Sequence, residues 1–391
     1  YSDRNDHFSW IGDFVIMVHL ISDYDLGYRL AIIEKDDETE HNDSFERLYY
    51  SDGRITFRSD NASIVLNEKL SLFFDSLHSG DIISINSKGL CYVLYNQDLG
   101  DTVFFMGGKC NSNCIMCPAV DEERKSEFPN QLSETLALIS MIPERINYFV
   151  VTGGEPTLNK DGFLQVIKAL SDKLIDPNGI ILTNGRSFSS EEFVDEYLKI
   201  SPANTVVAIP VHASTPELHD YITRAEGSFR QTIKGICNLL KRKVFVEIRI
   251  VVTKVNCDDL LNIAKLITEH FPMVYRVHFI SLEVRGNCIR NKDLVYISPE
   301  DSFKKSRAAI DYLVSHGINV GLYNYPLCNV DRKYWFLYKR SIAAEKAVYA
   351  DNCSECDLRC DCGGLFVSTL KTVDPNTYPI KLLGEKNDKS F

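Results

Sequence analysis

The sequence predicts an α/β protein whose central part is flanked by a small β-rich region and a cysteine-rich region. Between residues 101 and 285, six short apolar runs typical of buried strands alternate with five amphipathic helical patterns. Residues 1–100 contain short β-type runs separated by turn residues, and residues 286–391 hold closely spaced cysteines. We therefore expect three domains: 1–100 is β-rich, 101–285 is a strand–helix domain, and 286–391 is cysteine-rich.

Composition narrows the class of protein. The 391 residues are too many for one typical domain, and 45% apolar with 25% charged residues is ordinary for a globular protein. A net charge of −11 argues against a general polyanion binder, so we expect no nucleic acid. No apolar run is long enough to span a bilayer, so we expect no membrane. Among the twelve cysteines, two groups have the metal-binding spacings C-x3-C-x2-C and C-x2-C-x5-C, which favours a reducing, cytoplasmic location.

The region before residue 100 shows β-type patterns without a catalytic constellation. The sequence Ser51-Asp52-Gly53-Arg54 is typical of a hairpin turn, and a second turn is expected at residues 87–89. A scaffold, a lid and recognition of a substrate peptide all remain open as its role. The expected strands are 14–20, 29–34, 47–50, 81–85 and 90–95.

Strands that alternate with helices form parallel βαβ units. We expect strands at 102–106, 148–152, 179–183, 205–211, 244–252 and 276–282. The helices between them are expected near 131–142, 160–173, 190–199, 228–241 and 257–270. In α/β barrels the chemistry lies at the carboxyl ends of the strands, so the loops there are the places to search.

A loop with three cysteines follows the first of these strands. Cys110, Cys114 and Cys117 have C-x3-C-x2-C spacing, directly after Gly107 and Gly108. Four-iron clusters are otherwise held by four cysteines, so three thiolates would leave one iron of a [4Fe–4S] cubane open to a ligand. The alternative is a structural zinc site or a set of buried cysteines, although zinc would need a fourth ligand nearby.

The second strand ends in Gly153-Gly154-Glu155-Pro156, a glycine-rich loop with one carboxylate. Alone, this loop is also compatible with an ordinary turn between a strand and a helix. Together with the cysteine loop it resembles the radical S-adenosylmethionine (SAM) superfamily. That resemblance implies a partial (β/α)6 barrel and a SAM-binding [4Fe–4S] cluster on the three cysteines. It also implies SAM contacts from the glycine-rich loop. Met116 stands where the family usually has an aromatic residue.

The same resemblance implies that one electron from the cluster cleaves SAM to methionine and a 5′-deoxyadenosyl radical. An electron donor such as flavodoxin or ferredoxin would then be a partner. Polar residues at other strand ends are candidate SAM contacts, namely Asn184, Ser214, Arg249 and Glu283. Each of the last three has a structural alternative: Ser214 could belong to a helix-capping set, Arg249 to an ion-paired outer face, and Glu283 to a solvated loop. Arg249 and Glu247 point to one face of their strand, and the inner face is favoured.

The tail combines Cys328 with Cys353, Cys356 and Cys362. This C-x2-C-x5-C pattern resembles the SPASM and Twitch extensions of peptide-modifying radical SAM enzymes. A full SPASM region would have another cysteine where Phe366 stands, so the resemblance implies a Twitch-like domain with one auxiliary [4Fe–4S] cluster. A zinc site with four thiolates is the alternative, and the role of Cys360 stays open. We expect helices near 299–316 and 331–347, with a strand at 319–323.

From about Leu77 onward, the chain resembles the C-type radical SAM maturase of His-Xaa-Ser peptide systems. The resemblance rests on Leu77 to Leu94, the cysteine loop, Leu282-Glu283, Pro326-Leu327-Cys328 and Cys362-Gly363-Gly364. It implies a ribosomally made peptide substrate and a second radical SAM maturase as partner. Two alternatives remain: an enzyme acting on a small molecule or nucleotide, and a non-catalytic subunit of a maturase pair.

Overall fold

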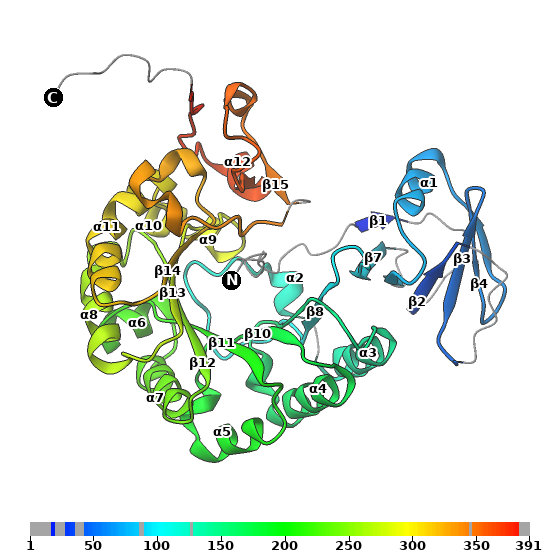
Figure 1. Ribbon diagram of the computed structural model, residues 1–391, viewed down its shortest axis with the longest axis horizontal. Coiled ribbons are helices and arrows are strands. Elements are labelled where there is room, and N and C mark those ends of the chain that lie inside the picture. The colour runs from blue at the N-terminus through cyan, green and yellow to red at the C-terminus, as the bar shows by residue number, and fades with distance from the viewer. Residues whose placement is uncertain are drawn as a thin grey trace.

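Parallel strands from the middle of the chain line one side of a curved sheet, with helices outside it (Figure 1). The computed structural model describes residues 17–19, 28–35, 43–85, 90–125, 128–343 and 346–382. Within them, one 14-stranded sheet has the order β14-β13-β12-β11-β10-β9-β8-β7-β6-β2-β3-β4-β5, and β1 pairs with β7. The predicted α/β class is therefore confirmed, with parallel strands in the middle and mostly antiparallel pairing in the N-terminal part.

The parallel part runs from β8 to β14, and each strand pairs in parallel with the next. Its strands are β8 (Asp101–Phe105), β9 (Tyr148–Thr152), β10 (Asn178–Leu182), β11 (Asn204–Pro210), β12 (Phe245–Val251), β13 (Arg276–Ile280) and β14 (Val320–Tyr323). The main helices are α3 (Phe128–Met141), α4 (Lys160–Lys173), α5 (Glu191–Leu198), α6 (Pro216–Thr223), α7 (Ser228–Lys241), α8 (Leu260–His270) and α11 (Pro299–Ser315).

Side chains alternate between the two faces of each strand because successive residues point to opposite sides. Val246, Ile248 and Ile250 of β12 belong to the large core under the helices. Glu247 and Arg249 therefore project from the opposite, concave face, and both are buried. The inward orientation predicted for this pair is what the structure shows, so the concave face carries buried charge.

One expectation about the barrel has to be corrected. The strand expected at 319–323 as part of the cysteine-rich domain is β14, which pairs in parallel with β13 and follows α11. It thus adds a seventh parallel strand to the six that the sequence predicted. The reason is that α11 packs on α8 and returns the chain to the sheet edge as another helix–strand unit.

The N-terminal part extends the same sheet, and its strands pair antiparallel except for β2 and β3, which pair in parallel. Its elements are β1 (Met17–His19), β2 (Arg29–Glu34), β3 (Arg47–Ser51), β4 (Arg54–Phe57), β5 (Ser63–Val65), α1 (Glu68–Asp75), β6 (Ile82–Ile85) and β7 (Leu90–Tyr95). The β3–β4 hairpin turns at Asp52-Gly53, both at positive φ, as the turn residues predict. The turn expected at 87–89, and parts of the strand expected at 14–20, lie outside the described residues.

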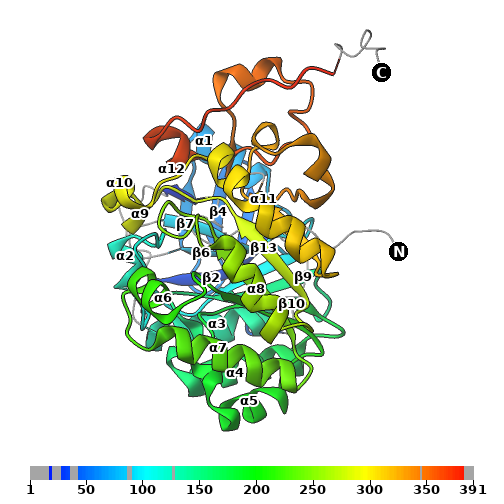
Figure 2. The same ribbon diagram turned by 90° about the vertical axis from the view of Figure 1, so that its left-hand side faces the viewer.

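The tail follows β14 and lies at the top of Figure 1, whereas the N-terminal sheet lies at the right; Figure 2 shows the tail at the top as well. It contains the small pair β15 (Ala347–Val348) and β16 (Leu365–Phe366), and α12 (Val367–Thr372). The helix expected at 331–347 is wrong: in the described part of that range only a 3-10 segment forms, at Arg332–Leu337. The chain then extends beside β14, where Tyr338 bridges to Leu322, so tertiary pairing overrides the helical pattern.

Candidate active site

The cysteine loop follows β8 and is held in place by backbone hydrogen bonds from two directions. The N–H groups of Asn113 and Ile115 each donate at 2.9 Å to carbonyls at the end of α6. On the other side, the Asn287 N–H donates to the Cys117 carbonyl at 2.8 Å, from the short helix α9 (Asn287–Arg290). Cys110, Cys114 and Cys117 are half-buried on this loop.

The glycine-rich loop after β9 lies directly against the cysteine loop. The Gly154 N–H donates to the Gly107 carbonyl at 2.8 Å, and the Glu155 N–H to the Lys109 carbonyl at 2.9 Å. A Cβ on Gly154 would lie 2.2 Å from the Gly108 carbonyl oxygen, closer than any real contact. Glycine is therefore required for this approach, and the two motifs form one backbone-bonded unit.

The Glu155 carboxylate is buried and accepts hydrogen bonds from four donors. Oε1 accepts from the Thr157 N–H at 3.0 Å, the Thr157 hydroxyl at 2.5 Å and the Thr183 hydroxyl at 2.6 Å. Oε2 accepts from the Asn184 N–H at 2.7 Å. Burial raises the pKa of Glu155, and the hydrogen bonds oppose that shift. The side chain thus ties the end of β9 to the end of β10.

Hydrogen-bond donors already surround the sulfurs of the cysteine loop. The Ser112 N–H donates to Cys110 Sγ at 3.4 Å, and Arg124 Nη1 donates to Cys117 Sγ at 3.3 Å. Donors to the sulfurs are one of the means by which proteins tune iron–sulfur clusters. Burial raises the pKa of the Cys110 thiol to about 11, so metal binding would have to displace its proton. The donor set fits thiolates that hold a cluster.

Of the other predicted SAM contacts, Asn184 lies beside the cysteine loop. Its Nδ2 donates to Asn111 Oδ1 at 2.6 Å and lies 4.0 Å from Cys110 Sγ. Met116 instead packs in a buried apolar cluster with Ile222 and Leu282. Pro156 is also buried and begins the 3-10 turn after the glycine-rich loop.

The predicted contacts Ser214 and Glu283 have protein partners in the structure. The Ser214 N–H and hydroxyl both donate to the Asp259 carboxylate at 2.7 Å, while Thr215 is the N-cap of α6. The capping alternative therefore describes this segment, with Thr215 as the cap. Glu283 lies against the tail, where the Ser368 hydroxyl donates to it at 3.5 Å.

Glu247 lies in a buried cluster of charged and polar side chains inside the barrel, of which the sequence predicted only Glu247 and Arg249. Glu247 accepts from Arg249 and, at 2.6 Å, from Arg276 Nε, and His278 lies 3.3 Å from it. The pKa of Glu247 is lowered despite its burial because the Arg249 guanidinium, the His278 ring and the Arg276 guanidinium lie beside it. Arg276 and His278 alternate with apolar residues along β13, as Glu247 and Arg249 do along β12. This alternation could have predicted from the sequence that Arg276 and His278 also face the inside of the barrel.

Two buried histidines were not assigned a definite role by the sequence. The rings of His212, after β11, and His219, on α6, lie 5.4 Å apart. Ser228 Oγ lies 3.1 Å from His219 Nδ1, whereas His219 Nε2 and His212 Nδ1 have no hydrogen-bond partner among the described residues. Burial lowers the pKa of His212 to about 3 and that of His219 to about 4.

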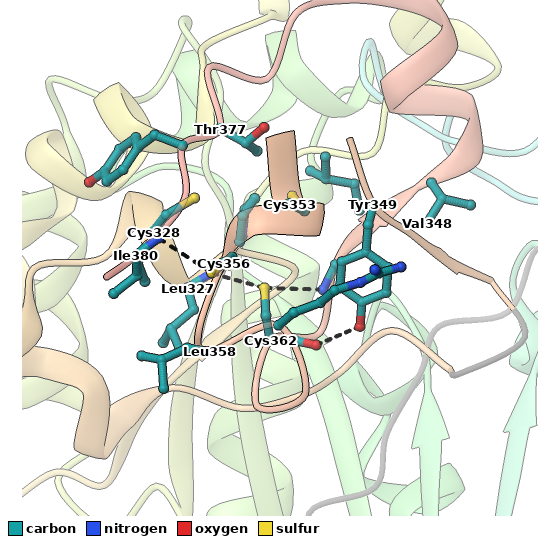
Figure 3. A pocket seen from close by; sticks show the side chains of 15 residues that line it. Leu327, Cys328, Val348, Tyr349, Cys353, Cys356, Leu358, Cys362, Thr377 and Ile380 are labelled. Atoms are coloured by element: carbon teal, nitrogen blue, oxygen red, sulfur yellow. Dashed lines mark hydrogen bonds between the residues drawn. The ribbon is translucent and has the colours of Figure 1, made fainter. Parts of the chain in front are cut away.

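The four tail cysteines named from the sequence line one cavity (Figure 3). Cys328 follows β14, and Cys353, Cys356 and Cys362 come from the loop between β15 and β16. Cys360 is exposed and does not line this cavity. Within the described parts of the chain, no three His, Cys, Asp or Glu side chains converge as they would around a single metal ion.

Backbone groups point at the sulfurs of this cavity as well. Cys362 Sγ accepts from the Leu327 and Gly364 N–H groups, each at 3.4 Å, and Cys356 Sγ accepts from the Ile380 N–H at 3.3 Å. Gly364 has φ +69°, a conformation that glycine adopts without strain. The tail cavity thus has the donor set expected around thiolate ligands.

Comparison with known protein families identifies the family that the central part of the chain matches. Residues 104–267 match the model of the radical SAM superfamily. This segment is a radical SAM domain. It contains the cysteine loop and the glycine-rich loop, and the parallel sheet is typical of the radical SAM partial barrel. The superfamily implies a [4Fe–4S] cluster and SAM as cofactors of this segment.

Two curated relatives share this similarity. An AdoMet-dependent heme synthase from Oleidesulfovibrio alaskensis is 29% identical over 163 residues, which cover 40% of this chain and 39% of that protein. The enzyme of the same name from Nitratidesulfovibrio vulgaris is 27% identical over 166 residues, covering 40% and 41%. The chain therefore matches only about two-fifths of the length of these relatives.

Among solved structures, Streptococcus suis SuiB bound to precursor peptide SuiA is similar, with a TM-score of 0.45 and 15% identity. The match covers 57% of this chain and 48% of SuiB. In the described part of the chain, no helix is both long and apolar enough to cross a membrane.

Proposed function

We propose that this protein is a radical SAM enzyme, that it modifies a ribosomally made peptide, and that it uses a second cluster held by its tail. The observation that carries the proposal is the cavity lined by Cys328, Cys353, Cys356 and Cys362, with backbone N–H groups directed at its sulfurs. The arrangement matches the cysteine pattern that resembles Twitch domains of peptide-modifying enzymes. The resemblance to His-Xaa-Ser maturases adds a second radical SAM protein as partner.

In this proposal Cys110, Cys114 and Cys117 hold the SAM-binding cluster. When bound, that cluster supplies the electron for reductive cleavage of SAM. The chain's own residues orient the parts: Glu155 fixes the ends of β9 and β10, and Arg124 donates to Cys117 Sγ. Asn184, held by both Glu155 and Asn111, is the polar side chain placed to contact SAM beside the cluster.

The tail would hold its cluster through four thiolates. An auxiliary cluster beside a radical site can pass an electron or bind substrate, whereas zinc has no redox chemistry. The N–H groups of Leu327, Gly364 and Ile380 would stabilise the negative charge on the thiolates. Glu283 connects this region to the barrel through Ser368, so the tail is anchored at the end of β13.

A small-molecule substrate is the second candidate. It is favoured by the two relatives named AdoMet-dependent heme synthase. Both matches cover about two-fifths of this chain, so they leave the substrate unassigned. A non-catalytic subunit of a maturase pair remains the third alternative.

Cleavage of SAM is the first test. Anaerobically reconstituted protein with dithionite should convert SAM to 5′-deoxyadenosine. Replacing Cys110, Cys114 and Cys117 together with Ala should abolish the product. The matched control replaces Cys237 and Cys257, which are half-buried outside both cysteine groups, and should keep it. If the triple variant formed 5′-deoxyadenosine at the parental rate, the assignment of the cluster to these three cysteines would be wrong.

The second test addresses the substrate. The protein is co-expressed with a candidate precursor peptide that contains His-Xaa-Ser repeats, with and without a second maturase, and the peptide is analysed by mass spectrometry. A mass change that requires this protein supports peptide modification. A heme precursor consumed in place of any peptide supports the second candidate. SAM cleavage by the pair, but not by this protein alone, supports the non-catalytic subunit.

A further inference from the structure

An ion pair links the helical turn after the cysteine loop to the loop after β13. Glu123 lies on α2 (Asp121–Arg124), and Arg285 lies 162 residues further along the chain. Arg285 Nη1 donates to Glu123 Oε2 at 3.0 Å, while its Nη2 donates to Oε1. The Arg285 side chain is 16% exposed and that of Glu123 32%, so water screens the pair only in part. Two parallel hydrogen bonds fix its geometry as well as its charge.

The same two side chains also hold the backbone of this turn. Arg285 Nη1 donates to the Pro118 carbonyl at 2.9 Å. Glu123 Oε2 accepts from the Val120 N–H at 3.1 Å. Each charged group thus binds its partner and one backbone group at once. Residues 118–124 are therefore held against the loop after β13.

Glycine at position 286 permits the close approach of these two segments. Gly286 has φ +57°, and a Cβ there would lie 2.5 Å from the Ala119 carbonyl oxygen. Real Cβ atoms do not come so close to backbone oxygens, and glycine adopts positive φ without strain. The two segments are therefore in backbone contact beside the ion pair.

The ion pair sets the position of the next residue, Arg124. Its Nη1 donates to Cys117 Sγ at 3.3 Å, and its Nη2 donates to the Ser112 carbonyl at 3.0 Å. One guanidinium thus spans the cysteine loop and meets its third sulfur. Because Arg124 follows Glu123 directly, a displacement of α2 would move the guanidinium away from Cys117.

We propose that the Glu123–Arg285 pair is a clasp that holds Arg124 against Cys117 and thereby raises the reduction potential of the cluster. The inference rests on the proposed function, in which the three cysteines of the loop hold a [4Fe–4S] cluster. Reduction adds negative charge that the ligand sulfurs share, and a guanidinium donor stabilises this charge more than the oxidised state. Glu123 and Arg285 act through Arg124, so they are positioning residues.

The test measures the reduction potential by electron paramagnetic resonance during a redox titration. The signal of this cluster is the one that is absent when Cys110, Cys114 and Cys117 are replaced by Ala. Arg124→Gln and Arg285→Gln should each shift the reduction equilibrium about tenfold toward the oxidised form, a potential lower by about 59 mV for one electron. Arg124→Lys keeps the positive charge and should recover part of that loss.

A double variant separates positioning from an independent effect. If Arg285 acts through Arg124, adding Arg285→Gln to Arg124→Gln should lower the potential no further. Arg290→Gln is the matched control, because the Arg290–Asp121 pair also joins α2 to the segment after β13 but both side chains are half exposed. Its potential should match that of the parent, since an exposed ion pair is weak and screened by water.

Release of iron to a chelator is a second readout, and it requires no SAM. Arg285→Gln should release the iron of this cluster about fivefold faster than the parent because the loop is less firmly held. If Arg285→Gln fails to fold, Glu123→Gln, which keeps the size of the side chain and removes its charge, gives the same two measurements.

Three results would overturn the inference. The first is a parental potential in both single variants, and the second is a further fall of the potential in the double variant. The third is faster release of iron at an unchanged potential, which would leave the clasp with a purely structural role. A parent protein without the signal of this cluster would refute the proposed function itself, and the inference with it.

Discussion

The N–H of Glu155 donates to the carbonyl oxygen of Lys109 across 2.9 Å. This bond joins the loop after β9 to the loop after β8, and the bond from Gly154 to Gly107 reinforces it. Neighbouring parallel strands end at the same edge of a sheet, so the two loops meet without a long connection. The cysteine loop and the glycine-rich loop are therefore positioned as one unit.

Gly154→Ala should push the glycine-rich loop away from the cysteine loop. The new Cβ would lie 2.2 Å from the Gly108 carbonyl oxygen and 2.4 Å from that of Lys109, and backbone atoms cannot move aside cheaply. We expect a loss of about 1–3 kcal/mol of unfolding free energy. Iron loading of the first cluster and SAM affinity should fall as well, as measured by metal analysis and calorimetry.

Gly317→Ala is the control for that substitution. Gly317 has φ +74°, and a Cβ added there would have nothing within 4 Å, so Ala should cost only about 1 kcal/mol of backbone strain. Its iron content and SAM affinity should match the parent. Normal SAM binding by Gly154→Ala would show that close contact between the loops is dispensable.

Glu155→Gln tests whether the carboxylate holds the fold of the site or contacts only SAM. An amide cannot accept from donors on both sides as the carboxylate does, so the Asn184 or Thr183 bond is lost. We expect about 1–3 kcal/mol of lost stability in SAM-free protein, together with weaker SAM binding. Weaker binding with unchanged urea unfolding would assign Glu155 to SAM contact alone.

The buried histidines predict a pH dependence. Since burial lowers their folded-state pKa values to about 3 and about 4, the unfolded chain takes up their protons first, below about pH 6.5. Their contribution to stability is present above that pH and is lost as the pH falls. Between pH 7 and pH 5 each should cost roughly 2 kcal/mol.

The measurement is urea unfolding of reconstituted parent and of a His212→Gln, His219→Gln protein at pH 7, 6 and 5. Both proteins carry the same clusters, so the clusters' contribution to the unfolding free energy cancels when the two proteins are compared. The double variant should have a smaller slope of unfolding free energy against pH. Equal slopes for the two proteins would mean that neither histidine is kept neutral by the fold.

The tail cysteines give a prediction about metal content. With Cys110, Cys114 and Cys117 replaced by Ala, the protein should still bind about four irons per chain. A further Cys362→Ser should remove that iron because Cys362 lines the cavity, whereas Cys360→Ser should not because Cys360 is exposed. One zinc per chain in the triple variant would identify the tail as a structural zinc site.

Much of the fold was predictable because the sequence patterns that indicate its helices and strands are local. The expected strand 29–34 and the helices 160–173 and 228–241 coincide with β2, α4 and α7. Apolar periodicity and capping residues such as Asn159 define these elements from residues that are close together in the chain. The cysteine spacing likewise predicted which four cysteines line the tail cavity.

What the sequence did not predict depends on contacts between distant segments. Ser214 binds Asp259, and β14 joins the barrel because α11 packs against α8. The aromatic segment after Asp331 forms only a 3-10 helix and then bridges to β14 at Tyr338, instead of forming a longer helix. Arg124, Arg224 and Arg290, which lie near the cysteine loop, come from three separate helices or their ends, so no motif in the sequence links them.

The junction between the N-terminal sheet and the barrel has a consequence for dissecting this protein. Among the described residues, Tyr95–Thr102 is the only pair in the strand register between β7 and β8. Ile32, Ile82 and Tyr95 nevertheless belong to the same apolar core as the barrel helices. A fragment starting at residue 101 would expose that part of the core to water and leave β8 as an unprotected edge. Such a fragment should aggregate, so swapping N-terminal modules between enzymes of this kind would require transplanting the packing surface of α3 as well.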